Sequence, residues 1–268
     1  MNDIKLIVSD IDGTLVGDGQ GYGALDYEYY EVIHELVGRG IRFMACSGRQ
    51  RQSITKLFQP IISDIYMACD GGSNIFRGGN LLFSKTLPRE IANAVICDAR
   101  KVDLCDVLVC TAKRAYCEHD GSEMYHWMVD SYGFDMEVVK DMTCDIKEEI
   151  VKVSVYHKDR AEELTNPWFR PKWEKENVKL SLAGIQWLDC VPKDAGKGTA
   201  LRFMQEHFHV TPEQTLVFGD NQNDMEMFEQ AGVSYAVAGA RDEVKQAAMY
   251  ECDSYENNGV LKILKKLF

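Results

Sequence analysis

The sequence contains no long apolar run, and its basic residues are outnumbered by its acidic ones. No apolar segment approaches the roughly 20 residues that a membrane helix requires, which argues against a membrane span. Asp3 and Lys5 border only a short apolar run, so we expect no signal peptide. With 30 Lys and Arg against 42 Asp and Glu, the net charge of −12 disfavours nucleic acid and anionic membranes as partners. These features predict a soluble, cytoplasmic protein.

The nine cysteines lack the spacing of a metal site or a disulfide framework. Their number is odd, and no Cys-x-x-Cys motif occurs. Cys46, Cys69 and Cys110 lie inside apolar runs, where a thiol behaves as a small hydrophobic side chain. We therefore predict reduced, largely buried cysteines, as is usual in the cytosol.

Continuous apolar runs alternate with segments of helical spacing over the first seventy residues. We expect strands at 5–9, 41–46 and 65–69 and helices at 27–38 and 53–58. The same alternation returns near the C-terminus, with helices expected at 199–207, 224–231 and 242–249 and strands at 215–218 and 235–239. Apolar strands joined by helices indicate a parallel sheet that is covered on both faces.

The pattern changes between about residue 85 and residue 186. We expect helices at 91–101, 123–130 and 162–176, and Pro167 and Pro171 interrupt the last of them. We expect a hairpin formed by 107–111 and 114–118, a half-buried strand at 150–157 and a further strand at 178–183. No internal repeat is present. The sequence therefore predicts an α/β protein with a doubly wound, Rossmann-like core domain (1–84 and 187–268) and an inserted α+β domain (85–186).

Four of the apolar strands end in polar loops. These loops are Asp10-Ile11-Asp12, Ser47-Gly48-Arg49, Asp70-Gly71-Gly72 and Gly219-Asp220-Asn221. Open α/β sheets bind their ligands beyond the carboxyl ends of the strands. If the four strands are neighbours in the sheet, their loops meet at one site.

The acidic residues of these loops predict a magnesium site. Asp10 and Asp12 repel each other unless a cation compensates their charges or one of them is protonated. Asp220 would add a third carboxylate. Hard oxygen donors suit Mg²⁺, which retains water ligands and accepts a phosphate oxygen of a substrate. Because the loops contain neither sulfur nor imidazole, zinc is disfavoured.

A carboxylate beside such a metal is able to attack phosphorus. Asp10 ends a rigid strand and suits the nucleophile, whereas Asp12 lies further into the loop and suits the acid and base that protonates the leaving oxygen and then activates water. Lys197 and the hydroxyl group of Ser47 or Thr14 are candidates for holding the transferred phosphate.

Four motifs resemble those of the haloacid dehalogenase superfamily of phosphatases. They are DIDGTL at 10–15, SGR at 47–49, KGTAL at 197–201 and GDNQNDMEM at 219–227, and they stand in the order of that family. The insert resembles the subclass IIB cap of the Cof-like hydrolases by its position and pattern. The resemblance covers the whole chain.

The resemblance implies a role for each motif residue. Asp10 would be the nucleophile, Asp12 the acid and base that also offers its backbone carbonyl to Mg²⁺, and Asp220 the second side chain on the metal. The transferred phosphate would be held by Ser47, Gly48, Lys197 and Asn223. Asp224 would support the metal's water ligands or Lys197. One departure is Asp70, where family members often have Asn; its carboxylate would need a cation such as Arg49 or an amine of the substrate.

These residues allow other interpretations. An EF-hand is rejected because its sixth and twelfth positions would be Leu15 and Gly21. A phosphate-binding P-loop at 196–199 is rejected because Val191 and Gly198 occupy required positions. Ser47 and Arg49 could contact phosphate or only cap a helix, and Asp224 could be only a helix N-terminal charge. Gly17, Gly19, Gly21 and Gly23 suit either a flexible flap or an ordinary loop.

The residues of the insert are less informative about the substrate. Its recognition could involve a set of polar and aromatic side chains that otherwise belong to the surface and core of the insert: Glu118, His119, Asp120, Tyr125 and Trp127.

Together these observations predict a Mg²⁺-dependent phosphomonoester hydrolase. It would act through an aspartyl-phosphate on a small phosphorylated metabolite, and the resemblance favours a sugar phosphate, with pyridoxal phosphate and flavin mononucleotide as further candidates. Two alternatives stay open: a phosphoryl transferase or mutase acting on sugar phosphates, and a non-catalytic sensor of a phosphorylated metabolite. The sequence does not indicate an oligomeric state.

Overall fold

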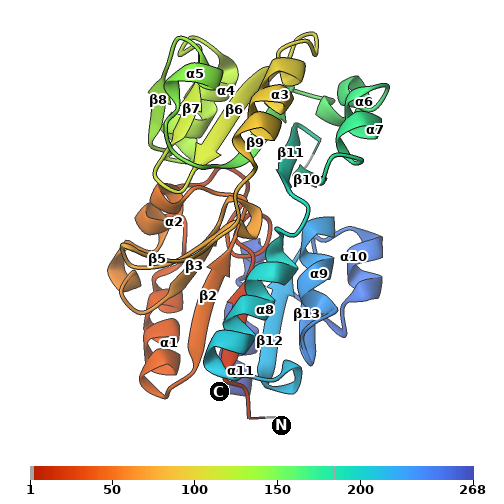
Figure 1. Cartoon of the computed structure of the whole chain (residues 1–268). Coiled ribbons are helices and arrows are strands. Elements are labelled where there is room, and N and C mark those ends of the chain that lie inside the picture. Colours follow the sequence, from red (N-terminus) through yellow and green to blue (C-terminus); the bar gives the residue numbers. More distant parts are fainter. Residues whose placement is uncertain (1–2, 184) are drawn as a thin grey trace.

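The chain folds around two β-sheets. The computed structural model describes residues 3–183 and 185–268; residues 1–2 and 184, which the predicted domain ranges include, lie outside it. Both ends of the chain build the larger sheet and its helices, and the middle of the chain builds the smaller sheet above them (Figure 1). The α/β fold predicted from the alternation of strands and helices is confirmed.

The larger sheet has eight strands in the order β14-β13-β12-β1-β2-β3-β4-β5. The first six strands of this order are parallel, and β4 and β5 form an antiparallel hairpin at one edge. Their bounds are Leu6–Ser9 (β1), Arg42–Cys46 (β2), Tyr66–Cys69 (β3), Asn74–Arg77 (β4), Asn80–Ser84 (β5), Thr215–Gly219 (β12), Val233–Val237 (β13) and Tyr250–Cys252 (β14). The order reverses between β1 and β12, as in other doubly wound sheets.

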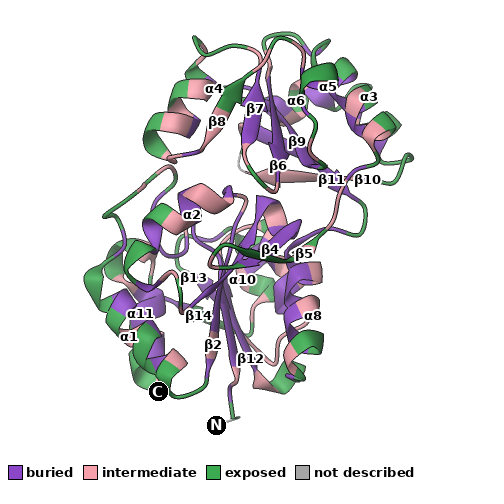
Figure 2. Cartoon of the chain, turned by 60° about the vertical axis from the view of Figure 1, so that its left-hand side comes forward, coloured by how far each residue is buried: buried purple, intermediate pink, exposed green. Residues whose placement is uncertain are grey.

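Helices cover both faces of this sheet. They are α1 (Tyr27–Gly38), α2 (Arg51–Leu57), α8 (Lys197–Phe208), α9 (Met225–Phe228), α10 (Asp242–Ala247) and α11 (Gly259–Leu267). In Figure 2, α1 and α11 lie on one side of the strands and α8 on the other. Asp26 caps the start of helix α1, because its side chain accepts a hydrogen bond from the backbone N–H of Glu28. The helix buries Tyr29, Ile33 and Leu36 against the sheet.

The smaller sheet has six strands in the order β10-β11-β9-β6-β7-β8. Its strands are β6 (Asp106–Thr111), β7 (Ala115–Cys117), β8 (Met136–Val138), β9 (Ile150–Tyr156), β10 (Val178–Ala183) and β11 (Trp187–Pro192), and its helices are α3 (Arg89–Ala99), α4 (Glu123–His126), α5 (Met142–Asp145), α6 (Ala161–Thr165) and α7 (Phe169–Trp173). We call the unit built around this sheet the insert.

The expectation that the strand at 150–157 is half-buried is wrong. All seven residues of β9 are buried. Val153 and Val155 pack into one apolar cluster of the insert, and Val151 packs into another. Because β9 is a central strand between two clusters, both of its faces are covered.

The division of the chain into two domains stays a prediction, and we propose to move its second boundary. Strand β11 was not predicted, and the sequence analysis assigned its residues to the core. It pairs with β9 and β10 in the smaller sheet, from Trp187 to Pro192. We therefore propose that the insert extends to Pro192 rather than to residue 186.

Most of the cysteines are buried, as the sequence predicted. The nine cysteines, all among the described residues, carry free thiols, and six of them are buried. Within residues 3–183 and 185–268, no helix is both long enough and apolar enough to cross a membrane.

The loop after β3 has an unusual backbone. Asp70, Gly71 and Gly72 all have positive φ angles, of 54°, 73° and 92°. A Cβ atom on Gly72 would lie 2.4 Å from the carbonyl oxygen of Gly196, whereas one on Gly71 would meet nothing within 4 Å. Gly72 therefore allows this loop to approach the start of helix α8, where Lys197 is the first residue.

We predict that Gly72→Ala destabilises the protein much more than Gly71→Ala. Both changes place a side chain at positive φ, which costs about 1 kcal/mol. At Gly72 the overlap with the backbone of Gly196 adds to that cost and brings the total to about 3 kcal/mol. Urea-induced unfolding of the two variants measures the difference. Equal losses of unfolding free energy would contradict the close approach.

Candidate active site

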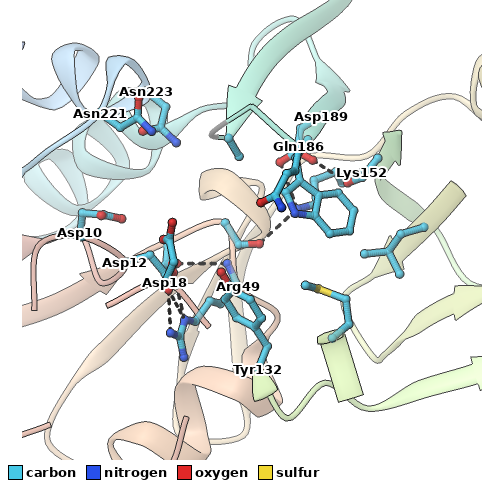
Figure 3. Close-up of a pocket in the computed structure, with 18 of the residues that line it drawn as sticks. Asp10, Asp12, Asp18, Arg49, Tyr132, Lys152, Gln186, Asp189, Asn221 and Asn223 are labelled. Carbon is cyan, nitrogen blue, oxygen red and sulfur yellow. Dashed lines mark hydrogen bonds and ion pairs between the residues drawn. The ribbon is translucent and has the colours of Figure 1, made fainter. Parts of the chain in front are cut away.

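The four polar loops singled out in the sequence meet at one edge of the larger sheet. Strands β12, β1, β2 and β3 are consecutive neighbours and all are parallel, so their carboxyl ends lie side by side. Beyond these ends is a cavity of about 170 Å³, lined by residues of the loops after β1, β2 and β12 and by residues of the insert. Figure 3 shows part of its lining.

Lys197 joins two of the acidic residues. Its Nζ atom lies 2.5 Å from Oδ1 of Asp10 and 2.6 Å from Oδ1 of Asp224, and all three side chains are buried. Burial alone would lower the pKa of Lys197, but the two carboxylates raise it well above its usual value. The lysine is therefore a fixed positive charge at the base of the cavity.

Asp220 lies beside Asp10, as the sequence predicted. The hydroxyl group of Thr14 is within hydrogen-bond distance of both carboxylates, 3.3 Å from Oδ2 of Asp10 and 3.4 Å from Oδ1 of Asp220. Gly13 makes this approach possible, because a Cβ atom there would lie 2.4 Å from Oδ2 of Asp220. Burial and the charge of Asp224 raise the pKa of Asp220 to about 7. Burial likewise raises the pKa of Asp10, against the opposing effect of Lys197.

These carboxylates fit a divalent cation. Oxygen atoms of Asp10, Asp220 and Asp224 all lie within 4.8 Å of one another. In Asp224, Oδ1 is bound by Lys197 and Oδ2 accepts hydrogen bonds from the backbone N–H groups of Asp220 and Asn221. Asp224 therefore holds the loop and the lysine in place, which leaves Asp10 and Asp220 as the better candidates for side-chain ligands of Mg²⁺.

The side chain of Asp12 points to Arg49 rather than to the acidic cluster. The Nε and Nη2 atoms of Arg49 lie 2.6–3.2 Å from the Asp12 carboxylate, and Nη2 also donates to the backbone carbonyl of Gln20. The guanidinium group lies 4.8 Å from the centre of the Tyr132 ring, which belongs to the insert. Arg49 does not cap helix α2, which has Gln50 at its N-cap, but pairs with Asp12 and contacts the insert. Its contact with phosphate stays a prediction.

The remaining predicted residues also lie at the cavity. Ser47 donates a hydrogen bond from Oγ to Asp12, at 3.2 Å, and its Oγ accepts one from the backbone of Arg49. Gly48 and Asn223 line the cavity. The Oδ1 atom of Asn223 is buried without a hydrogen-bond partner in the described part of the chain, so it is available to a ligand.

The insert contributes residues that the sequence analysis did not identify. Lys152, Ser154, Gln186, Trp187 and Asp189 line the cavity, and so does Asp18 from the glycine-rich segment. A lysine inside the apolar run of β9 was the available signal, but one sequence does not reveal that this lysine contacts the loop after β2. Among the five insert residues considered for substrate recognition, Trp127 is part of the described lining, whereas Glu118 pairs with Arg100.

Asp70 is not paired with Arg49, which was one of the cations considered for it. Its Oδ2 atom accepts a hydrogen bond from Asn74 at 3.1 Å, and Oδ1 has no partner among the described residues. Burial raises the pKa of Asp70 to about 6, and the charge of Lys152 partly opposes this rise.

Comparisons with known proteins show which proteins this chain is similar to. A model of the haloacid dehalogenase-like hydrolase family matches residues 7–264. A crystal structure from Eubacterium rectale is 41% identical over 99% of both chains, with a TM-score of 0.88. The 5-amino-6-(5-phospho-D-ribitylamino)uracil phosphatase YbjI of Escherichia coli is 24% identical over 98% of this chain and 96% of its own. The subclass IIB sugar phosphatase BT4131 is 18% identical over 98% of both chains and, with a TM-score of 0.79, shares the fold.

We predict that Asp70→Asn removes part of the pH dependence of stability. A carboxyl group whose pKa rises on folding stabilises the folded state fully below its unfolded pKa, and this stability is lost as the pH rises through about 6. Between about pH 4 and about pH 8, wild type should therefore lose about 2 kcal/mol relative to Asp70→Asn. Urea unfolding across this range measures the difference, and parallel curves for the two proteins would contradict it.

Proposed function

The chain belongs to the haloacid dehalogenase-like hydrolase family, and from this premise we propose that it is a Mg²⁺-dependent phosphomonoester hydrolase acting through an aspartyl-phosphate. One observation supports this most: Asp10 ends a buried strand with Lys197 and Asp220 beside it, at a cavity between core and insert. Nucleophile, cation and metal-binding carboxylates are the groups that phosphoryl transfer requires.

The first step transfers the phosphoryl group to the enzyme. A carboxylate oxygen of Asp10 attacks phosphorus, the ester P–O bond breaks, and the leaving alkoxide takes a proton from Asp12. The ammonium group of Lys197, the hydroxyl group of Ser47, the N–H of Gly48 and the amide of Asn223 would hold the phosphate oxygens. To act as an acid, Asp12 must turn one oxygen out of its pair with Arg49.

The second step releases phosphate. Asp12 takes a proton from a water molecule, whose oxygen attacks phosphorus, and the P–O bond to Asp10 breaks, which regenerates both carboxyl groups. Asp10 and Asp220, with the backbone carbonyl of Asp12, would hold Mg²⁺. When bound, the ion neutralises the phosphate charge that these carboxylates would otherwise repel.

We propose sugar phosphates and related phosphorylated polyols as substrates. The Escherichia coli relative is named for a substrate with a phosphorylated ribityl chain, and BT4131 is described as a sugar phosphatase. The insert, as a cap over the site, would exclude water and contact the organic half of the substrate. If the protein is instead a phosphoryl transferase, it should transfer the phosphoryl group to an added sugar in preference to water, whereas a hydrolase transfers it to water.

We expect Asp10→Asn to lower kcat by about 10⁴-fold or more, because it removes the nucleophile while Lys197 keeps its contact with Asp224. Phosphate release from a panel of phosphomonoesters with Mg²⁺ measures this, and EDTA should abolish it until Mg²⁺ is restored. Asp253→Asn, at an exposed carboxylate of the core, is the matched control. Turnover that survives both EDTA and Asp10→Asn would disprove the mechanism.

We expect Asp12→Asn to separate the two steps. 4-Nitrophenolate leaves without a proton, so this variant should release about one equivalent of it per active site in a burst and then stall as the phosphorylated enzyme. An alkyl phosphate should give no burst. Stopped-flow absorbance measures the burst, and mass spectrometry locates the phosphoryl group on Asp10. Unimpaired steady-state turnover by Asp12→Asn would show that Asp12 is not the acid and base.

A further inference from the structure

The insert presents a buried polar group to the cavity. Lys152 and Ser154 lie two residues apart on β9, and Asp189 on β11 is paired directly with Ser154. The three residues, which we call the Asp189 cluster, are more than nine-tenths buried, and all three line the cavity. Figure 3 shows Lys152 and Asp189 beside Gln186, away from the loop that carries Asp10.

The Asp189 carboxylate is able to accept more hydrogen bonds than Lys152 and Ser154 donate to it. Oδ1 of Asp189 accepts a hydrogen bond from the hydroxyl group of Ser154 at 2.6 Å, and Oδ2 accepts one from Lys152 at 3.2 Å. Since a carboxylate has about four acceptor positions, the described residues leave two of them free. Lys152 also donates to the backbone carbonyl of Gly48 at 3.1 Å, which ties the cluster to the loop expected to bind phosphate.

The stability of the folded protein does not explain why these charged groups are buried. A buried ion pair is often no more stabilising than apolar side chains of the same volume. The other residues that line the cavity from the insert are largely apolar or aromatic. They include Leu108, Trp127, Met128, Phe134 and Trp187. The rings of Trp127 and Trp187 stack with their centres 6.3 Å apart. The cluster therefore places isolated hydrogen-bonding groups in an apolar wall, which is how binding sites fix the orientation of a ligand.

We propose that the Asp189 cluster is the subsite for hydroxyl groups on the organic half of the substrate. The free acceptor positions of Asp189 take hydrogen bonds from hydroxyl groups, Lys152 and Ser154 hold the carboxylate in place, and the aromatic wall covers the C–H faces of the chain or ring. The inference rests on the proposed phosphatase function. It selects phosphomonoesters of sugars and polyols over those of flat rings or alkyl chains without hydroxyl groups.

The experiment compares two substrates in each protein. Ribose 5-phosphate carries hydroxyl groups and phenyl phosphate carries none, so the ratio of their kcat/KM values reports on the subsite. We expect Asp189→Asn to lower this ratio by about 10- to 100-fold, the loss that corresponds to hydrogen bonds with a charged group, mainly through the KM for ribose 5-phosphate.

Two further variants keep the test independent of folding defects. Asp98→Asn is the matched control, because Asp98 is also a buried carboxylate of the insert paired with lysine, at Lys101 and Lys172, but is not part of the described cavity lining; it should leave the ratio unchanged. Ser154→Ala keeps both charges of the cluster and loosens Asp189, and it should lower the ratio by several-fold.

The outcomes separate the subsite from the proposed function. If wild type hydrolyses phenyl phosphate but shows no preference for ribose 5-phosphate, or if Asp189→Asn slows both substrates equally, the subsite is disproved and the phosphatase stands. If wild type hydrolyses neither these two nor any other phosphomonoester of the panel, the proposed function fails and the subsite fails with it. A ratio that falls in Asp189→Asn and holds in Asp98→Asn supports the subsite.

Discussion

The buried contacts of Lys197 with Asp10 and Asp224 are the interaction on which the rest of the site depends. They connect the end of β1, the start of α8 and the loop after β12, which come from opposite ends of the chain. Without the ammonium group, two carboxylates would be buried with no compensating charge, which typically costs 3–5 kcal/mol for a broken pair. The same charge that stabilises this junction lies where a transferred phosphate would have to be neutralised.

The core and the insert contribute different kinds of side chain to the site. The core supplies a dense set of charges at the ends of parallel strands, and the insert supplies an apolar wall interrupted by the Asp189 cluster. Arg49 and Lys152 connect the two, through the ring of Tyr132 and the carbonyl of Gly48 respectively. The position of the insert is therefore coupled physically to the loops that carry Asp12 and the expected phosphate-binding groups.

Much of the core could be predicted because its signals are local. Continuous apolar runs identified β1, β2, β3 and β12, and their adjacency and the phosphatase family are confirmed. The β4–β5 hairpin and β11 were missed, since short strands that contain charged or polar residues lack a clear period. The roles of Asp10, Asp12 and the other site residues stay predictions, although all of them except Thr14 and Asp224 belong to the described lining of one cavity.

The sequence by itself determined the phosphatase family and the carboxylate, hydroxyl and lysine side chains available to the site, because the four motifs that carry them are local features of the chain. Only the tertiary structure decided which groups of the core and of the insert meet. Asp12 pairs with Arg49, Asp70 accepts a hydrogen bond from Asn74, and Lys152 and Asp189 reach the cavity from the insert. Except for the hydrogen bond of Asp70, these contacts join residues far apart in the chain, and their existence depends on strand order and on how the insert packs over the core, neither of which leaves a local pattern in one sequence.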